Sequence, residues 1–173
     1  DYEFIFADND SSDDSEQILR KIASKDEKFK VILNNRNFGP ECNTINALYA
    51  ASGDAVALVM CDRQDPYELI PRFIEEWKKG NKVVWGQKTS SKENWLMYQI
   101  RALYYKIIMV FAEVKQYKQV IGYGIYDKSV IEEIKGLRNP NPILRNTIPI
   151  LGYKPLLIPY TQKCREKGNT SYN

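Results

Sequence analysis

Short apolar runs alternate with segments of helical pattern along the first half of the chain, and few folds accommodate such an alternation. The connecting loops are short, and glycine follows several of the helical segments. Strands and helices that alternate in this way indicate an α/β fold, in which a mostly parallel sheet is flanked by helices. We expect strands at 2–7, 29–33, 55–60 and 82–86, and helices after Asp13, at 41–51 and at 67–79.

The residues at the ends of these elements predict how they begin and stop. Ser12 or Asp13 is placed to cap the first helix, and Pro66 suits the first turn of the helix at 67–79. Gly53 is expected to supply a left-handed cap after the helix at 41–51. The run at 55–60 is continuously apolar, which predicts a strand buried on both faces.

The second half of the chain is less regular. The segment 95–111 predicts a long amphipathic helix, which is either ordinary core, a shelter for an apolar substrate or a surface that lies on a membrane. Gly122 and Gly124 lie in a strand-like run at 120–126 and suit a bulge or a close backbone approach to a ligand. The remaining expected elements are a helix capped by Asp127 that runs through 134, a helix at 143–151 and a strand at 153–159.

Histidine is absent from all 173 residues, and this excludes much chemistry. A Ser-His-Asp triad, a Cys-His pair and a zinc site with an imidazole ligand all require it. Any general base must be a carboxylate, or the reaction must need none. The chain has 25 basic and 22 acidic side chains, and the net charge of +3 is too small to indicate nucleic-acid binding.

The three cysteines follow no metal-binding spacing, and their odd number favours a reducing, cytosolic compartment. Cys42 and Cys61 have small or apolar neighbours and are expected to be core residues. The sequence has neither a signal peptide nor an uninterrupted apolar stretch long enough to span a bilayer.

Aspartates follow two of the expected strands. Asp8 comes after the first strand, and Asp62 and Asp65 come after the strand at 55–60. Ligands bind beyond the carboxyl ends of strands in such sheets, so these loops suggest a hard cation held together with phosphate oxygens. The alternative is that such aspartates only cap helices, which we expect of Asp13 and Asp14.

Charge is also unevenly placed at the two ends of the chain. The first 16 residues are acidic and lack basic side chains, whereas the last ten include Arg165 and Lys167. The two ends could share one anionic ligand, or they could be a solvated acidic loop and a frayed tail.

Several segments, taken in order, resemble family 2 glycosyltransferases with the GT-A fold, of the type that includes dolichol-phosphate mannose synthases and bacterial polyprenyl-phosphate glycosyltransferases. The stretch MCDRQDPYELIP at 60–71 closely resembles the family's A-D-x-Q-D-P-P-E-L-I-P, and its part QDPYELIP at 64–71 is the most specific. The other matching segments are FADNDSSD at 6–13, RNFG at 36–39, GYGIYDK at 122–128, Leu144-Arg145 and the ending REKGNT at 165–170.

The resemblance implies a role for each matched loop. Nucleotide binding would fall to two segments, namely Asp8, Asn9 and Asp10 in one and Arg36, Asn37 and Gly39 in the other. Asp62 would bind Mg²⁺ or Mn²⁺ that bridges the diphosphate, and Gln64 and Asp65 would line the sugar-phosphate side. Arg165 would lie near the phosphates or the acceptor.

The sequence departs from the family pattern at several of these positions. Asn9 and Asp10 replace the usual Asp-Gly, which alters the nucleotide loop, and Met60 replaces the first aspartate of a D-x-D motif. Gly122 and Gly124 stand where the mannose-synthase branch has Asp and Arg. Without that aspartate and without histidine, a lipid-phosphate acceptor is favoured, because a phosphate monoester is already an anion at neutral pH and needs no base.

The family's first strand and helix would precede Asp1. A sheet that lacks this strand would expose edges, so we expect the residues to be a fragment or a segment outside them to supply the strand. Many family members continue into transmembrane helices after the ending that residues 165–170 resemble. We therefore treat 1–173 as a single glycosyltransferase domain and expect a removed membrane anchor.

The function expected from the resemblance is transfer of a hexose from a nucleotide-diphosphate sugar, with inversion, to a polyprenyl phosphate at the cytosolic face of a membrane. Such a reaction would serve cell wall or polysaccharide biosynthesis. The alternatives are a soluble transferase acting on a glycan hydroxyl, a catalytically silent module that binds nucleotide sugars, and a nucleotidyltransferase, whose glycine-rich, lysine-containing loop would precede residue 1. The sequence does not indicate an oligomeric state.

Overall fold

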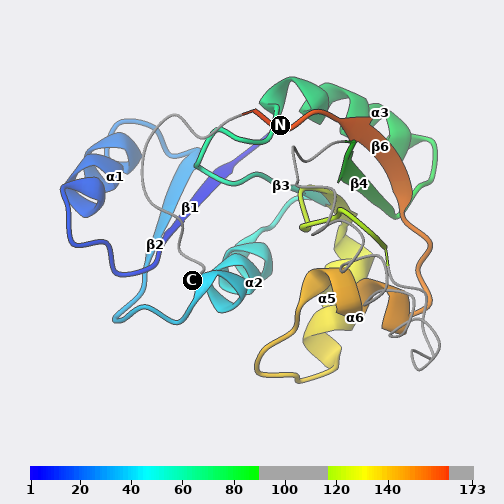
Figure 1. Cartoon of the computed structure of the whole chain (residues 1–173). Coiled ribbons are helices and arrows are strands. Elements are labelled where there is room, and N and C mark those ends of the chain that lie inside the picture. The colour runs from blue at the N-terminus through cyan, green and yellow to red at the C-terminus, as the bar shows by residue number, and fades with distance from the viewer. Residues whose placement is uncertain (90–116, 164–173) are drawn as a thin grey trace, which may run out of the picture. The chain divides into compact units, whose positions relative to one another are not determined.

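A computed structural model of the chain describes residues 1–89 and 117–163 (Figure 1). They divide into two compact units. The first unit comprises Asp1–Val56 and Asp127–Ile143, and the second comprises the described residues of Ala57–Tyr126 and Leu144–Asn173. The helix expected at 95–111 and the predicted site residue Arg165 lie outside the described residues.

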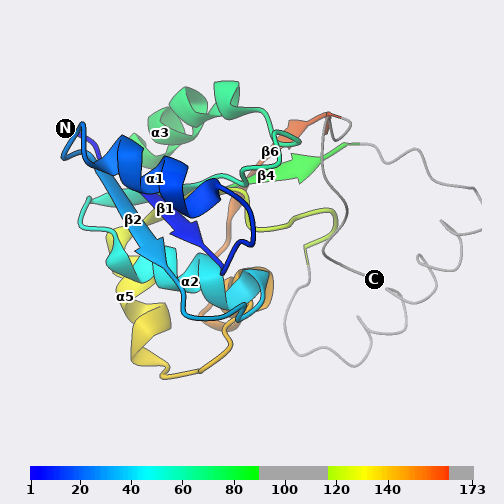
Figure 2. The same ribbon diagram turned by 90° about the vertical axis from the view of Figure 1, so that its left-hand side faces the viewer.

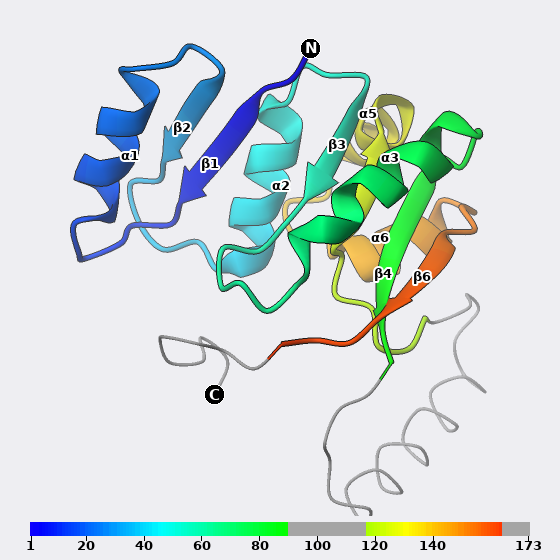
Figure 3. The same cartoon turned by 90° about the horizontal axis from the view of Figure 1, so that it is seen from above.

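The first unit is built on a pair of parallel strands, β1 (Phe4–Asp8) and β2 (Phe29–Leu33). Helix α1 (Ser15–Ala23) packs mainly against β2, and α2 (Pro40–Ala50) packs against β1 (Figures 2 and 3). The register aligns Asp8 with Leu33, so the loops after both strands begin at the same edge of the pair.

Helix α5 (Lys128–Gly136) completes this unit and packs against α2, and its Val130, Ile131 and Ile134 are buried. The Asp127 side chain accepts a hydrogen bond from the backbone N–H of Ser129, which confirms the predicted cap. At α1 the N-cap is Asp14 and not the predicted Ser12 or Asp13, and the Asp14 side chain makes no capping hydrogen bond. Asp13 lies one residue earlier, and its Oδ1 accepts from the backbone N–H of Ser15 at 3.0 Å.

A second sheet, most of whose residues belong to the second unit, has the strand order β3-β5-β4-β6. Its strands are β3 (Ala55–Leu58), β4 (Val83–Lys88), β5 (Gly124–Asp127) and β6 (Leu156–Tyr160). β4 pairs with β6 in parallel and with β5 antiparallel, so the sheet is mixed. The α/β class is confirmed, and the described strands are divided between two sheets.

The core of the second unit is rich in aromatic side chains. Trp85, Tyr123, Tyr126 and Phe73 are each fully buried. Phe73 comes from α3 (Ile70–Lys78), which packs on β4, and the last helix is α6 (Leu144–Ile150). The helix expected at 67–79 is split, because a 3₁₀ turn, η1 (Tyr67–Leu69), precedes α3. Pro71 lies in the first turn of α3, where its missing N–H costs no hydrogen bond.

Two predictions about the middle of the chain are wrong. β3 is not buried on both faces, because Ala57 is exposed and the other three residues are half-buried. The reason is that β3 ends the order of its sheet, so β5 is its only neighbour among the described strands. Gly53 does not form a left-handed cap, since α2 ends at Ala50 and Ala51 continues in an extended conformation with φ −73° and ψ 138°.

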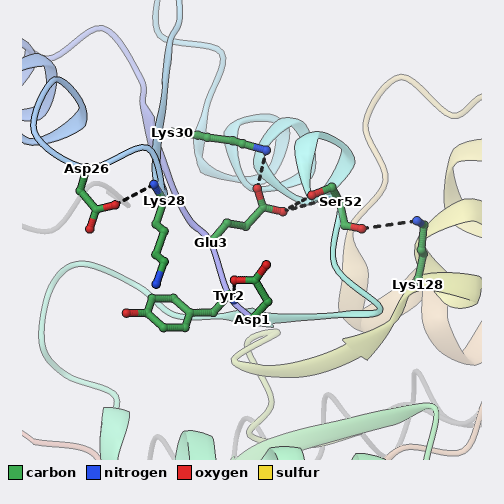
Figure 4. A network of polar contacts seen from close by, with 8 residues as sticks. All are labelled: Asp1, Tyr2, Glu3, Asp26, Lys28, Lys30, Ser52 and Lys128. Atoms are coloured by element: carbon green, nitrogen blue, oxygen red, sulfur yellow. Dashed lines mark hydrogen bonds and ion pairs between the residues drawn. The ribbon is translucent and has the colours of Figure 1, made fainter.

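Glu3 holds the chain where it leaves α2 (Figure 4). Its Oε1 accepts from the backbone N–H and the hydroxyl of Ser52, both at 2.7 Å, and its Oε2 pairs with Lys30 Nζ on β2 at 2.5 Å. The ion pair with Lys30 and the bonds from Ser52 lower the pKa of Glu3 to about 2. Lys128 Nζ donates to the Ser52 carbonyl at 3.4 Å, so this network also reaches α5.

Within residues 1–89 and 117–163, no helix is long and apolar enough to cross a bilayer.

Candidate functional site

Asn9 links the loops that follow β1 and β2. Its Oδ1 accepts from Asn34 Nδ2 at 3.1 Å and from the backbone N–H of Phe38 at 3.0 Å. Its Nδ2 donates to Asn37 Oδ1 at 2.8 Å, and the same oxygen accepts from the Gly39 N–H at 2.9 Å. The two predicted nucleotide segments therefore lie side by side and are joined by neutral amides.

The amide network continues to α2 and to β1. Asn34 Nδ2 also donates to Asn43 Oδ1 at 2.8 Å, and Asn43 Nδ2 donates to the Ala7 carbonyl at 2.8 Å. Asn46 Nδ2 donates to Asn34 Oδ1 at 3.2 Å. A hollow of about 240 Å³ lies beside this network and is lined by Asn34, Phe38, Cys42 and Asn46. Arg36 covers the Phe38 ring, with Cζ 4.2 Å from the ring centroid.

The carboxylate of Asp8 is bonded within its own loop. Its Oδ2 accepts from the Ser11 N–H at 3.0 Å and its Oδ1 from the Ser11 hydroxyl at 2.5 Å. Asp10 has a φ of +67°, a left-handed conformation that aspartate tolerates better than most residues. The residue that replaces the family's glycine here thus keeps a glycine-like backbone conformation.

The second predicted loop, 61–66, belongs to the second unit. Asp62 Oδ1 accepts from the Gln64 N–H at 3.1 Å, and Arg63 between them has a φ of +56°. Asp65 is only 2% exposed, and its Oδ1 accepts from the Tyr160 hydroxyl at 2.5 Å. Its Oδ2 is fully enclosed and has no hydrogen-bond partner among the described residues.

Burial raises the pKa of Asp65, and the charge of Asp62 raises it further. The hydrogen bond from Tyr160 and the charge of Lys88 act in the opposite direction. Burial also raises the pKa of Tyr160 and of Tyr123, and the charge of Asp65 adds to both shifts. Both phenols therefore remain protonated and act as hydrogen-bond donors.

The segment after β6 is attached to the same loop. The Lys163 N–H donates to the Gln64 carbonyl at 3.1 Å, and Gln64 Nε2 approaches the Lys163 carbonyl at 3.5 Å. Lys163 Nζ pairs with Glu68 Oε1 at 3.3 Å. Gln64 is thus held in place by Lys163, which is distant in sequence and is the last described residue before the predicted Arg165.

Sequence reasoning missed the tyrosines that support this loop. Tyr123 donates to the Pro66 carbonyl at 2.5 Å, and its ring packs edge-on against Tyr160 with 5.3 Å between centroids. A Cβ at Gly86 would lie 2.5 Å from Tyr123 Cδ1 and 2.9 Å from Tyr160 Cε1. A glycine inside an expected strand was the one sequence signal that could have indicated this close approach.

The glycines at 122 and 124 have structural partners. A Cβ at Gly124 would overlap the carbonyl oxygen of Val84, so the backbone that Gly124 approaches closely is that of β4, and an approach to a ligand stays a prediction. Gly122 has a φ of +94° and lies near the Tyr126 hydroxyl.

The predicted core position of Cys61 is wrong, because its side chain is exposed beside Asp62 in a loop. Cys42 is half-buried, and its thiol is bonded to Asn141 Oδ1.

Asp62 fits a cation only together with oxygens from a ligand. Within the described ranges 1–89 and 117–163, no group of three or more His, Cys, Asp or Glu side chains could hold a metal ion. Mg²⁺ does not require such a group, since one or two carboxylates plus substrate phosphates suffice. The assignment of Asp62 to a metal stays a prediction, as do the assignments to a nucleotide and a sugar.

Residues 1–135 match the family model described as glycosyl transferase family 2. The chain is 31% identical over 172 residues to the uncharacterized glycosyltransferase YkcC of Bacillus subtilis (strain 168), covering 99% of this chain and 53% of that protein. It is 28% identical over 172 residues both to the prophage bactoprenol glucosyl transferase homolog of Escherichia coli (strain K12) and to the bactoprenol glucosyl transferase of Shigella phage SfV.

These last two matches each cover 99% of this chain and 56% of the relative, so the chain spans about half the length of the curated relatives it matches. The family model covers residues 1–135, which include both aspartate loops and the stretch at 64–71. The chain belongs to glycosyl transferase family 2.

Proposed function

We propose that the protein transfers a hexose from a nucleotide-diphosphate sugar to a polyprenyl phosphate at the cytosolic face of a membrane. Family membership supports the sugar transfer. Two relatives that align with 99% of the chain are named bactoprenol glucosyl transferases or homologues of these, which supports a lipid-phosphate acceptor. Transfer with inversion, a role in cell wall or polysaccharide biosynthesis and association with a membrane are parts of the same proposal.

The loops of the first unit are proposed to bind the nucleotide. The observation that supports this is the set of amides around Asn9, which keeps both segments in fixed positions. Side-chain amides both donate and accept hydrogen bonds, as recognition of a base or a ribose requires. The proposed nucleotide-binding residues are Asp8, Asn9, Asp10, Arg36, Asn37 and Gly39.

The loop at 61–66 is proposed to act on the diphosphate and the sugar. Asp62 would hold Mg²⁺ or Mn²⁺, which when bound would neutralise the charge that develops on the departing nucleotide. Gln64 and Asp65 would orient the sugar phosphate. Arg165, outside the described residues, would contact the phosphates or the acceptor.

Two carboxylates of the predicted site, those of Asp8 and Asp65, are already engaged, which supports a phosphate acceptor. A sugar hydroxyl must lose a proton during transfer, and this ordinarily requires a general base. Asp8 is bonded to Ser11, and Asp65 is enclosed against Tyr160. A phosphate monoester is already ionised near neutral pH and makes no such demand.

A transfer assay tests this function. The protein expressed from its complete reading frame is incubated with Mg²⁺, polyprenyl phosphate and a panel of UDP- and GDP-sugars, and products are identified by mass spectrometry. We expect a glycosyl polyprenyl monophosphate with at least one donor. Transfer to a neutral sugar acceptor while polyprenyl phosphate stays unmodified would contradict the proposal.

A silent nucleotide-sugar-binding module is the second candidate, and Met60 and Gly122 favour it. Each stands where family members carry an acidic side chain. This candidate predicts that a nucleotide-diphosphate sugar binds and is neither transferred nor hydrolysed. The same assay, run beside a binding measurement, separates the two.

A further inference from the structure

The carboxylate of Asp65 is held by a single described hydrogen bond. The side chain is 2% exposed, so solvent does not orient it. Its Oδ1 accepts from the Tyr160 hydroxyl, 95 residues further along the chain, while its Oδ2 has no partner among the described residues. A buried carboxylate with one hydrogen bond depends on that bond for its orientation.

The Tyr160 hydroxyl is itself fixed by close packing. Tyr160 is 6% exposed, and its ring meets Tyr123 edge-on at an interplanar angle of 73°. The space that both rings occupy exists because residue 86 is glycine, where a Cβ would meet each ring at less than 3 Å. Neither ring can shift far without a clash against β4.

The backbone of Tyr160 is held as firmly as its ring. Its carbonyl accepts from the Thr89 N–H at 2.9 Å and from the Thr89 hydroxyl at 3.0 Å, and the parallel register pairs Tyr160 with Lys88. Three residues later the Lys163 N–H binds the Gln64 carbonyl, so β6 and the segment after it contact the loop at two points.

We propose that Tyr160 is a positioning residue for sugar transfer, whose hydroxyl keeps the Asp65 carboxylate, and with it Gln64, in the geometry that the reaction requires. The inference rests on the proposed function and deepens it, because it assigns a role to a β6 residue that lies outside the matched loops. Outer-shell residues that orient metal ligands cost about 10- to 100-fold in metal affinity or activity when they are replaced, and we expect an effect of this order for Tyr160.

The test is the variant Tyr160→Phe in the full-length protein, measured with a donor and acceptor pair found by the transfer assay. The ring and its packing are kept and only the hydroxyl is lost. We expect kcat to fall by about tenfold while the donor KM stays within about twofold of the unsubstituted value.

A double-mutant cycle with Asp65→Asn tests whether Tyr160 acts through Asp65. In the Asp65→Asn background the additional change Tyr160→Phe should lower kcat by less than about twofold, because the carboxylate to be positioned is gone. An equal tenfold loss in both backgrounds would overturn the proposal.

Tyr126→Phe is the matched control for loss of a buried hydroxyl. Tyr126 accepts from Trp85 Nε1 at 2.9 Å and donates to the Gly122 carbonyl at 2.5 Å, and neither partner belongs to the loop. This variant should lower the midpoint of thermal unfolding at least as much as Tyr160→Phe and leave kcat within about twofold. If it reduces kcat as much as Tyr160→Phe does, the role of Tyr160 is purely structural and the inference is wrong.

The outcomes also separate the inference from the function on which it rests. No transfer by the unsubstituted protein with any pair contradicts the proposed function and removes the reaction that Tyr160 would serve. Normal transfer by the unsubstituted protein together with an unchanged kcat in Tyr160→Phe overturns the role of Tyr160 alone.

Discussion

The predicted ligand loops of the first unit and the predicted ligand loop of the second unit are stabilised by different means. The loops of the first unit are joined by neutral amides that lie 25 to 29 residues apart in sequence, with Asn9 bonded to residues 34, 37 and 38. The loop at 61–66 is supported by phenol hydroxyls and a backbone segment that come from up to 99 residues away. The first arrangement follows from two short segments, whereas the second requires the completed sheet of the second unit.

This difference predicts that the two regions respond differently to substitution. Damage to the packing under the 61–66 loop should destabilise the second unit as a whole, because the same tyrosines form its core. Substitutions in the amide network should cause a smaller loss of stability, confined to the loops that the network joins. Changes of charge in either region should have the smallest effects and should depend on pH.

The largest effect is expected for Gly86→Ala. The new Cβ would lie 2.5 Å from Tyr123 and 2.9 Å from Tyr160, both of which are buried. We expect a loss of about 3 kcal/mol in the free energy of unfolding, measured by urea denaturation. Gly136→Ala is the control, because a Cβ there meets nothing within 4 Å and the residue is helical. A neutral result at residue 86 would show that the tyrosine pair is loosely packed.

A smaller loss is expected for Asn9→Ala, which removes three hydrogen bonds between the loops of the first unit. The cost should be about 2 kcal/mol, since the partners at Asn34 and Asn37 are partly or wholly exposed and water replaces some of the bonds. Asn46→Ala removes one bond at the margin of the network and should cost less than about 1 kcal/mol. Urea denaturation of each variant measures the loss in the free energy of unfolding. Equal losses for Asn9→Ala and Asn46→Ala would contradict the central position of Asn9 in the amide network.

Glu3→Gln should cost about 1 kcal/mol at neutral pH, because Lys30 is half exposed and solvent screens the ion pair. The pKa of Glu3 is lowered to about 2 from an ordinary value of 4.5. Its contribution is therefore fully present above about pH 4.5 and is lost as the pH falls toward 2. Unfolding curves of both proteins should converge at that pH, and a constant difference would contradict the assigned network.

The contribution of Asp65 to the free energy of unfolding should change with pH in the opposite direction to that of Glu3, and the change should be small. Burial raises its pKa, so the folded state binds its proton more tightly than the unfolded chain does. The stability of the unsubstituted protein relative to Asp65→Asn should decline as the pH rises above about 4, because the ionised form is disfavoured in the fold. A relative stability that increases with pH would mean that Tyr160 and Lys88 outweigh burial.

Much of the fold could be predicted from local pattern. The strand at 29–33 and the cap at Asp127 depend on residues close in sequence, and the structure agrees with each. The burial of β3 could not be predicted, because the same apolar run suits a central or an end strand. The tyrosines under Asp65 were missed for a related reason, since the register of β4 and β6 is what brings Tyr160 to the loop.

Binding of a nucleoside diphosphate tests the proposed donor site most directly, because the nucleotide segments of the first unit and Asp62 are all assigned to this ligand. The midpoint of thermal unfolding is measured with UDP and with GDP, each with and without Mg²⁺ or Mn²⁺. The proteins compared are the unsubstituted protein, Asp62→Ala and the control Glu132→Ala, which removes an exposed carboxylate from α5. We expect at least one diphosphate to raise the midpoint by a few degrees only when the metal is present, and we expect Asp62→Ala alone to lose this rise. A rise that persists without metal and in Asp62→Ala, or the absence of a rise with every nucleotide, would contradict this assignment.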